Sequence, residues 1–282
     1  MDYQWYPGHM TKAKRMMQED MKLVDLVIEL TDARAPLSGR NPDIDELGRN
    51  KSRVILLNKA DMADETLNRC WEDYFQRMGL HAAAVNSRTG AGMKRIQAVI
   101  QDACREKVER DRKRGIQNRP VRAMVAGIPN VGKSTFINSF AGKACTKTGN
   151  KPGVTRGKQW IRLNKSVELL DTPGILWPKI EDAQVGFRLA ALGSIRDEVL
   201  QPEELSLRVL GFMKENYSEL LGARYQIDTA QEEAMLLGDI ARVRGCLKKG
   251  GEPDYEKAAL LFLDDFRSGR IGRMTLEQPP AV

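Results

Sequence analysis

The chain has few of the residues that build disulfide frameworks, zinc sites or membrane spans. Its four cysteines among 282 residues are widely scattered and form no Cys-x-x-Cys pair, so we expect reduced thiols and neither disulfides nor zinc ligands. No window approaches the ~20 consecutive apolar residues that a membrane helix needs. The start of the chain lacks the basic-then-apolar pattern of a secretory signal. These absences predict a cytoplasmic protein that does not bind a membrane.

Acidic residues are too few to balance the basic ones. Lysine and arginine number 45 against 38 aspartates and glutamates, which gives a formal charge of +7. Residues 105–122 carry eight basic and three acidic residues, and residues 141–166 carry seven basic residues and no acidic one. A solvated surface or a helix end remains an alternative for the first stretch. The overall balance favours an anionic partner, most simply nucleic acid.

Strand and helix patterns alternate through the first part of the chain. Short apolar runs predict strands over residues 24–30, 53–57, 82–86, 121–126, 158–163 and 167–170. Helical spacing predicts helices over residues 11–22, 64–78, 92–112 and 132–141. This alternation is typical of an α/β fold, a mostly parallel sheet with helices on both faces. After that only helices are predicted, so we expect an α/β domain over residues 1–178 and a small all-α domain over 179–282.

Residues 127–134, Gly-Ile-Pro-Asn-Val-Gly-Lys-Ser, match the P-loop that wraps nucleotide phosphates. Its glycines let backbone N–H groups converge on phosphate oxygens at the start of a helix. We expect Lys133 to reach the β- and γ-phosphates and the Ser134 hydroxyl to bind Mg²⁺. The expected nucleotide-binding residues of this segment are Pro129, Asn130, Val131, Gly132, Lys133, Ser134 and Thr135.

Residues 171–174, Asp-Thr-Pro-Gly, follow an apolar run downstream of the P-loop. Asp171 could hold Mg²⁺ through water, and the Gly174 N–H could meet the γ-phosphate. Such a sequence is common in turns, and its place after a P-loop is what makes it informative. Thr155 lies between the two motifs in a turn-rich segment. It is the best candidate for a threonine that covers Mg²⁺ in the triphosphate state.

Residues 58–61, Asn-Lys-Ala-Asp, match the guanine-reading motif of GTPases and follow a buried strand. The Asp61 carboxylate can accept two hydrogen bonds from guanine, and adenine lacks that donor pair. Lys59 can lie along the purine face, and Asn58 can tie the loop together. An ordinary polar loop after a strand is the alternative. Asn86 and Ser87 fit a second loop on the base side.

The order of these motifs is unusual, because ordinary GTPases carry the phosphate motif first and the base-reading motif last. Together with Trp5-Tyr6-Pro7-Gly8-His9-Met10 and Asp32-Ala33-Arg34, the motifs resemble the circularly permuted GTPases that act in ribosome assembly. The resemblance covers essentially the whole chain. It implies a circularly permuted Ras-like domain and GTP hydrolysis coupled to late maturation of the large (50S) ribosomal subunit. It also implies a helical domain that binds ribosomal RNA. We expect the protein to be monomeric off the ribosome.

Two positions depart from small-GTPase chemistry. Ile175 stands where many GTPases have a glutamine that orients the attacking water, and the resemblance suggests His9 for that role. A structural turn histidine is the alternative for His9. In related GTPases an asparagine at the place of Asn130 helps to bind K⁺, although it could be only a turn residue. Arg34 and Arg156 are possible arginine fingers, but surface contacts are the stronger expectation for both.

Two rival functions remain open at this point. One is a GTPase that acts on another RNA, such as tRNA. The other is a non-catalytic RNA-binding protein with a vestigial nucleotide site, against which the intact Lys133, Ser134 and Asp171 argue.

Overall fold

The chain forms two compact units in a computed structural model, which describes residues 15–117, 119–142, 144–145, 159–163, 166–172, 180–195 and 201–281. The α/β unit comprises Met1–Ala183 together with Thr275–Val282, and the helical unit comprises Gln184–Met274. The division therefore differs from the expected 1–178 and 179–282. The reason is that Thr275, Leu276 and Glu277 are buried, and their hydrogen bonds go to residues of the α/β unit.

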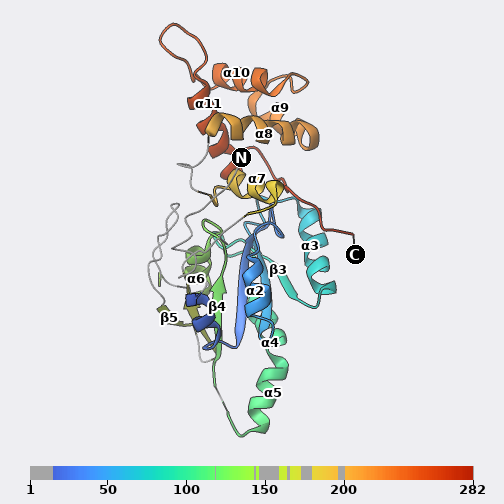
Figure 1. Cartoon of the computed structure of the whole chain (residues 1–282), viewed down its shortest axis with the longest axis vertical. Helices are drawn as coiled ribbons and strands as arrows, with labels where there is room; N and C mark the ends of the chain where they lie inside the picture. The colour runs from blue at the N-terminus through green and yellow to red at the C-terminus, as the bar shows by residue number, and fades with distance from the viewer. Residues whose placement is uncertain are drawn as a thin grey trace. The chain divides into compact units, whose positions relative to one another are not determined.

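The α/β unit is built on a six-stranded sheet with the order β3-β2-β1-β4-β6-β5 (Figure 1). The strands are β1 (Leu26–Asp32), β2 (Ser52–Asn58), β3 (His81–Ala84), β4 (Val121–Ala126), β5 (Gln159–Arg162) and β6 (Val167–Asp171). All neighbours pair in parallel except β5, which runs antiparallel to β6. The predicted fold class is confirmed, and the six strands fall within a few residues of their predicted positions.

The helices of this unit follow the expected alternation with two differences. Residues 15–21 are helical, and the other helices are α2 (Pro42–Leu47), α3 (Glu65–Arg77), α4 (Met93–Ala103), α5 (Arg105–Lys113) and α6 (Lys133–Ala141). The single helix predicted over 92–112 is wrong. Cys104 leaves helical geometry and separates α4 from α5, whose charged sequence buries no side chain. The short helix α2 was not predicted, and Asn41 caps it by accepting the Asp43 N–H.

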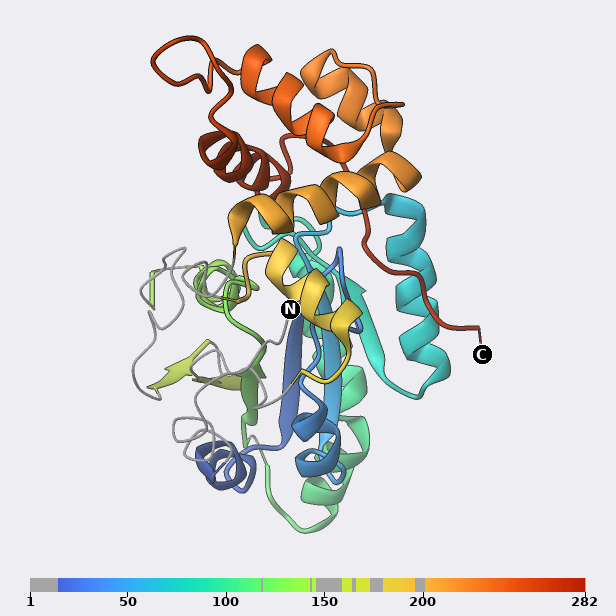
Figure 2. The same cartoon turned by 45° about the horizontal axis from the view of Figure 1, so that its top comes forward.

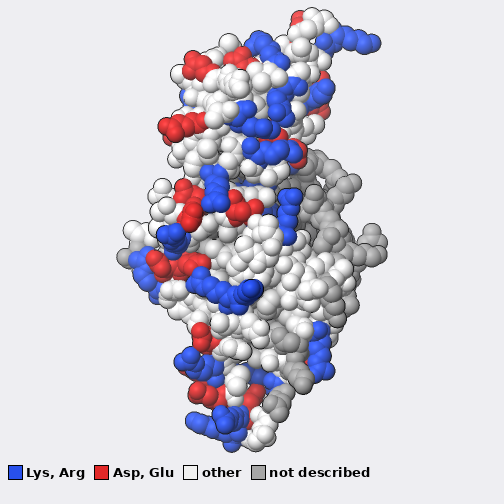
Figure 3. All heavy atoms as spheres, turned by 180° about the vertical axis from the view of Figure 1, so that it is seen from behind, with Lys and Arg blue, Asp and Glu red and all other residues white. Residues whose placement is uncertain are grey.

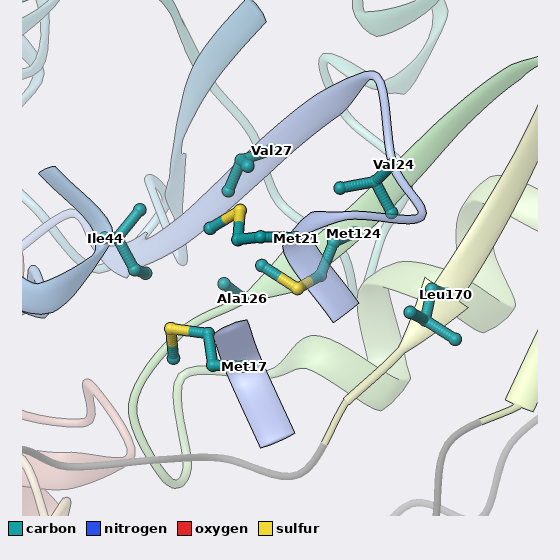
Figure 4. Close-up of a cluster of buried hydrophobic side chains, with 8 residues drawn as sticks. All are labelled: Met17, Met21, Val24, Val27, Ile44, Met124, Ala126 and Leu170. Carbon is teal, nitrogen blue, oxygen red and sulfur yellow. The ribbon is translucent and has the colours of Figure 1, made fainter. Parts of the chain in front are cut away.

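Both faces of the sheet are covered. Successive residues of a strand point to opposite faces, and Val27 and Ile28 on β1 are both fully buried, as are Val54 and Ile55 on β2. A methionine-rich cluster packs the helix over residues 15–21 and α2 against one of these faces (Figure 4). Its members are Met17, Met21, Val24, Val27, Ile44, Met124, Ala126 and Leu170. This cluster packs against β1, β4 and β6.

The helical unit contains α7 (Ala183–Ala191) apart from its first residue, α8 (Pro202–Asn216), α9 (Ser218–Tyr225), α10 (Glu233–Val243) and α11 (Tyr255–Arg267) (Figure 2). Its core forms where α8 packs on α10 and α11. The buried Asp265 carboxylate accepts hydrogen bonds from Arg224, Tyr225 and Arg270. Burial favours its neutral form, but these donors outweigh it and lower the pKa of Asp265.

Charges of both signs are mixed over the visible surface (Figure 3). In the basic stretch 105–122, Lys107 contacts Asp111 and Asp25, and Arg119 also contacts Asp25. Ion pairing and exposure favour a solvated helix for this stretch. Within the described parts of the chain, no helix is both long and apolar enough to cross a membrane.

Candidate nucleotide-binding site

The carboxyl ends of the parallel strands meet at one edge of the sheet. In open α/β sheets, ligands bind outside this edge, against the loops that follow the strands. The last residues of β1, β2 and β6 are Asp32, Asn58 and Asp171, and β4 leads directly into the P-loop. Motifs that are far apart in the sequence, and in permuted order, therefore lie on neighbouring strands.

Asn58 joins three of these loops through its side chain. Its Nδ2 donates to the carbonyl oxygen of Val131 in the P-loop at 2.8 Å. Its Oδ1 accepts from the backbone N–H of Ser87 at 3.1 Å and from the Ser87 hydroxyl at 2.7 Å. All these groups are buried, so each hydrogen bond satisfies a polar atom that has no access to water. The Asn58 side chain thus connects the loop after β2 to the P-loop and to Ser87. The predicted binding of a nucleotide by Asn58 and Ser87 stays a prediction.

The P-loop has the backbone geometry that close approach to an anion requires. Asn130 and Gly132 both adopt positive φ, of 61° and 96°. A Cβ atom on Gly127 would stand 2.5 Å from the Leu30 carbonyl oxygen, so this position has no room for a side chain. With these backbone conformations, the N–H groups of the loop can point toward phosphate oxygens at the start of α6.

Backbone carbonyl groups of the P-loop hold the Lys133 side chain in place. Its Nζ donates to the carbonyl oxygens of Gly127 and Ile128, both at 3.0 Å. Burial lowers the pKa of Lys133 to about 8, although the Asp171 carboxylate opposes this effect. An anionic ligand beside the ammonium group would raise the pKa of Lys133 again, because it favours the charged form.

The Asp171 carboxylate has a buried oxygen atom of the kind that binds a hard cation. Its Oδ1 is buried and has no hydrogen-bond partner among the described residues. Burial raises the pKa of Asp171 to about 6, against the opposing effects of Lys133 and Thr172. The Thr172 hydroxyl donates to the Val125 carbonyl oxygen at 2.8 Å and fixes the segment to β4. One carboxylate and the Ser134 hydroxyl are a donor set typical of Mg²⁺ that is shared with phosphates.

Lys59 is oriented by a neighbouring strand. Its backbone adopts positive φ, and its Nζ lies 2.9 Å from Oδ2 of Asp32 at the end of β1. Arg34 donates to both oxygens of the same carboxylate, at 2.9 Å each. Burial alone would raise the pKa of Asp32, but Arg34 and Lys59 hold it well below its usual range. Asp61, which follows Lys59 by two residues, is exposed and available to a ligand.

The structure corrects the expectation for Arg34 and limits how Asn86 could act, while the predicted nucleotide binding of Asn86 stays a prediction. Arg34 is 1% exposed and paired with Asp32, so it is neither a surface contact nor free to act as an arginine finger. The Asn86 side-chain oxygen accepts the N–H groups of Arg88 and Thr89 and closes its own turn. Any role of Asn86 toward a base therefore depends on its backbone or its amide nitrogen.

Several predicted residues lie outside the described residues, and their roles stay predictions. They are His9, Thr155, Gly174, Ile175, Arg156 and most of the basic stretch 141–166. Two further parts of the chain lie beside these loops and were not predicted to do so. The position of Asp32 at the end of a buried strand could have placed it at this edge of the sheet, although its pairing with Lys59 depends on the register of β1 and β2. The buried residues Thr275–Glu277 carried no comparable signal.

Comparison with known proteins agrees with this geometry. Residues 122–224 match the family model described as 50S ribosome-binding GTPase. The chain is 49% identical to Ribosome biogenesis GTPase A of Bacillus cereus over 280 residues, which is 99% of this chain and 95% of that protein. It is 34% identical to the protein of the same name from Thermotoga maritima, over 99% of this chain and 95% of the relative.

Solved structures give the same result. The crystal structure of GNP-bound YlqF from T. maritima matches with a TM-score of 0.69 at 30% identity, covering 96% of this chain and 100% of that one. The GDP-bound structure of YlqF matches with the same TM-score and covers 94% and 99%. The expected resemblance to ribosome-assembly GTPases is therefore confirmed. With nearly full-length similarity on both sides, this chain belongs to the ribosome biogenesis GTPase A family and is a GTPase of ribosome biogenesis.

Proposed function

We propose that the protein binds GTP at the carboxyl edge of the sheet and hydrolyses it during late maturation of the large ribosomal subunit. The observation that carries the proposal is the Asn58 side chain, which ties the base-reading loop to the P-loop. A P-loop that binds only phosphates has no need of this connection. A site that must read a base and hold its phosphates at a fixed separation does need it.

The residues of the site have distinct roles in this proposal. Asp61 accepts the two guanine donors, and Lys59 covers the purine face from the position that Asp32 gives it. Lys133 and the P-loop backbone bind the phosphates. Ser134 and, through water, Asp171 would hold Mg²⁺, whose positive charge would stabilise the negative charge of the phosphates. Thr155 and Gly174 complete the site on the γ-phosphate side.

His9 is the proposed group that orients the attacking water, because Ile175 has no hydrogen-bonding side chain. His9→Ala should then lower turnover on ribosomal particles while nucleotide affinity stays near that of the wild type. Unchanged stimulated turnover in this variant would exclude the role.

The partner in this proposal is the precursor of the large subunit and its ribosomal RNA. Support comes from the description of the matching family model, 50S ribosome-binding GTPase, and from the chain's charge of +7. Phosphate contacts by lysine and arginine dominate RNA affinity and make it sensitive to salt. The helical unit is the proposed RNA-binding part.

Sedimentation with purified ribosomal particles tests the proposal. We expect the protein to migrate with large-subunit precursors in the presence of a non-hydrolysable GTP analogue and to leave them with GDP. Co-purification with tRNA in place of these particles would favour the rival RNA substrate. Absence of GTP turnover, with and without particles, would favour the vestigial site.

A further inference from the structure

The C-terminal tail of the chain returns to the α/β unit and is buried there. Thr275, Leu276 and Glu277 are only 4%, 4% and 7% exposed, although they follow the last helix of the helical unit. The segment Thr275–Glu277 is called the strap below. Buried polar groups need hydrogen-bond partners. The partners of the strap residues indicate what the strap does.

Glu277 fastens the strap to the loop that follows β1. Its Oε1 accepts the N–H groups of Leu37 and Ser38, at 2.5 and 2.9 Å. Its Oε2 accepts the Ser38 hydroxyl at 2.5 Å. Its backbone carbonyl accepts the indole N–H of Trp71 at 3.3 Å. A buried carboxylate with three donors on one short loop fixes the backbone of that loop.

The other two strap residues contact backbone atoms of the loop after β1 and of the segment that follows Asp61. The Leu276 N–H donates to the Arg34 carbonyl oxygen at 2.6 Å. The Thr275 hydroxyl oxygen accepts the Asp64 N–H at 3.1 Å. Asp64 caps α3, three residues after Asp61, by accepting the N–H groups of Thr66 and Leu67.

The loop after β1 in turn holds the base-reading motif itself. Asp32 forms the ion pair with Lys59, and the Ala33 N–H donates to the Asn58 carbonyl oxygen at 2.8 Å. The strap therefore contacts the loop after β1, which holds Asn58 and Lys59, through Arg34, and it contacts the segment after Asp61 through Asp64. Every one of these contacts lies within the α/β unit.

We propose that the strap is a positioning element of the guanine-reading loop and sets how strongly the site discriminates guanine from other purines. The proposal rests on the proposed guanine site at Asp61. The strap residues do not touch the base. They hold the two backbone segments whose separation decides whether Asp61 can reach both guanine donors.

A comparison of GDP with IDP tests this role, because hypoxanthine keeps the N1 donor of guanine and lacks the 2-amino group. The ratio of the two dissociation constants reports the geometry of Asp61, since the phosphates and ribose are common to both ligands. A merely structural strap would change stability, or both affinities together, and leave the ratio unchanged. The protein to be used is the full chain.

Four variants and one control sharpen the measurement. Glu277→Ala removes both acceptors and should lower the GDP preference about tenfold, because the buried donors lose their partners. Glu277→Gln keeps one acceptor and should recover part of the preference. Thr275→Val and Ser38→Ala each remove one hydroxyl, with little change in volume, and should have smaller effects of the same sign. Gln278→Ala, at an exposed neighbouring position, should leave the ratio unchanged.

The outcomes separate the two proposals. If the wild type does not prefer GDP over IDP, the guanine-reading role of Asp61 fails, and the role of the strap fails with it. If the wild type discriminates and folded Glu277→Ala and Thr275→Val discriminate equally well, the strap is overturned and the guanine site stands. Should Glu277→Ala not fold, Thr275→Val and Ser38→Ala decide: a wild-type ratio in both overturns the proposal.

Discussion

The Nδ2 atom of Asn58 lies 2.6 Å from the point where a Cβ atom on Gly132 would stand. Asn58 cannot move away easily, because three hydrogen bonds hold its amide between the P-loop and Ser87. Position 132 therefore has no room for a side chain while Asn58 keeps these hydrogen bonds. A hydrogen atom at position 132 is the condition for joining the two halves of the site.

Gly132→Ala should weaken GDP binding by more than about tenfold, because displacing the Asn58 amide leaves buried polar atoms without partners. Calorimetric titration with GDP measures the effect. Gly142→Ala is the matched control, since Gly142 also has positive φ but its Cβ would meet nothing within 4 Å. It should reduce stability without changing affinity. Equal affinity losses in the two variants would attribute the effect to backbone strain alone.

Asp61→Asn should lower GDP affinity by about 2–4 kcal/mol, because a charged acceptor of two hydrogen bonds is lost. The same variant should gain affinity for XDP, whose 2-carbonyl oxygen can accept from the asparagine amide. Titration with GDP, XDP and ADP measures both changes. Wild-type GDP affinity in the variant, or a preference of the wild type for ADP, would refute the assignment.

Asp32→Asn should destabilise the α/β unit by about 3 kcal/mol near pH 7, because it leaves Arg34 buried without its counter-charge. The pKa of Asp32 is depressed in the folded state. Its ionised form therefore contributes stability that is present above the ordinary pKa of 3.8 and is lost as the pH falls toward the folded value. The difference between variant and wild type should shrink over that range in urea unfolding.

The exposed Glu65→Gln change is the control for Asp32→Asn, since Glu65 pairs with Arg69 on the surface of α3. Such pairs contribute about 0–1 kcal/mol. If Asp32→Asn were no more destabilising than Glu65→Gln at neutral pH, the buried ion pair would have no role in stability.

Hydrolysis on ribosomal particles should be faster in K⁺ than in Na⁺, if a cation binds beside Asn130 and supplies charge to the transition state. Asn130→Gly suits the test, because glycine tolerates the positive φ of this position while removing the amide. We expect the K⁺ advantage to disappear in this variant. Equal wild-type rates in matched K⁺ and Na⁺ buffers would leave Asn130 as a turn residue.

The sequence predicted those parts of the site that are local to one strand end. Asn58 and the P-loop can be recognised in the sequence because each motif follows a buried apolar strand. The ion pair between Lys59 and Asp32 could not be read in this way. It depends on the register of two strands, in which Asp32 stands opposite Asn58. No periodicity in either strand encodes that pairing.

Long-range contacts were beyond sequence reasoning for a related reason. Glu277 meets Leu37 across 240 positions of chain, and a lone glutamate in a short polar tail has the signature of a solvated residue. The break between α4 and α5 at Cys104 was not predicted, because the helical spacing of the sequence continues through it. The fold class was more accessible, since alternating strands and helices constrain the sheet without knowledge of any single contact.

The late position of the strap has a consequence for synthesis. The nascent chain leaves the ribosome with its N-terminus first. Thr275–Glu277 therefore emerge after the strands and helices of the α/β unit and after the whole helical unit. Domains begin to fold during translation. Until the strap arrives, the amides of Leu37 and Ser38 and the Trp71 indole must be satisfied by water. A nascent α/β unit can therefore complete its sheet well before the loops around Asn58–Asp61 reach their final hydrogen bonding.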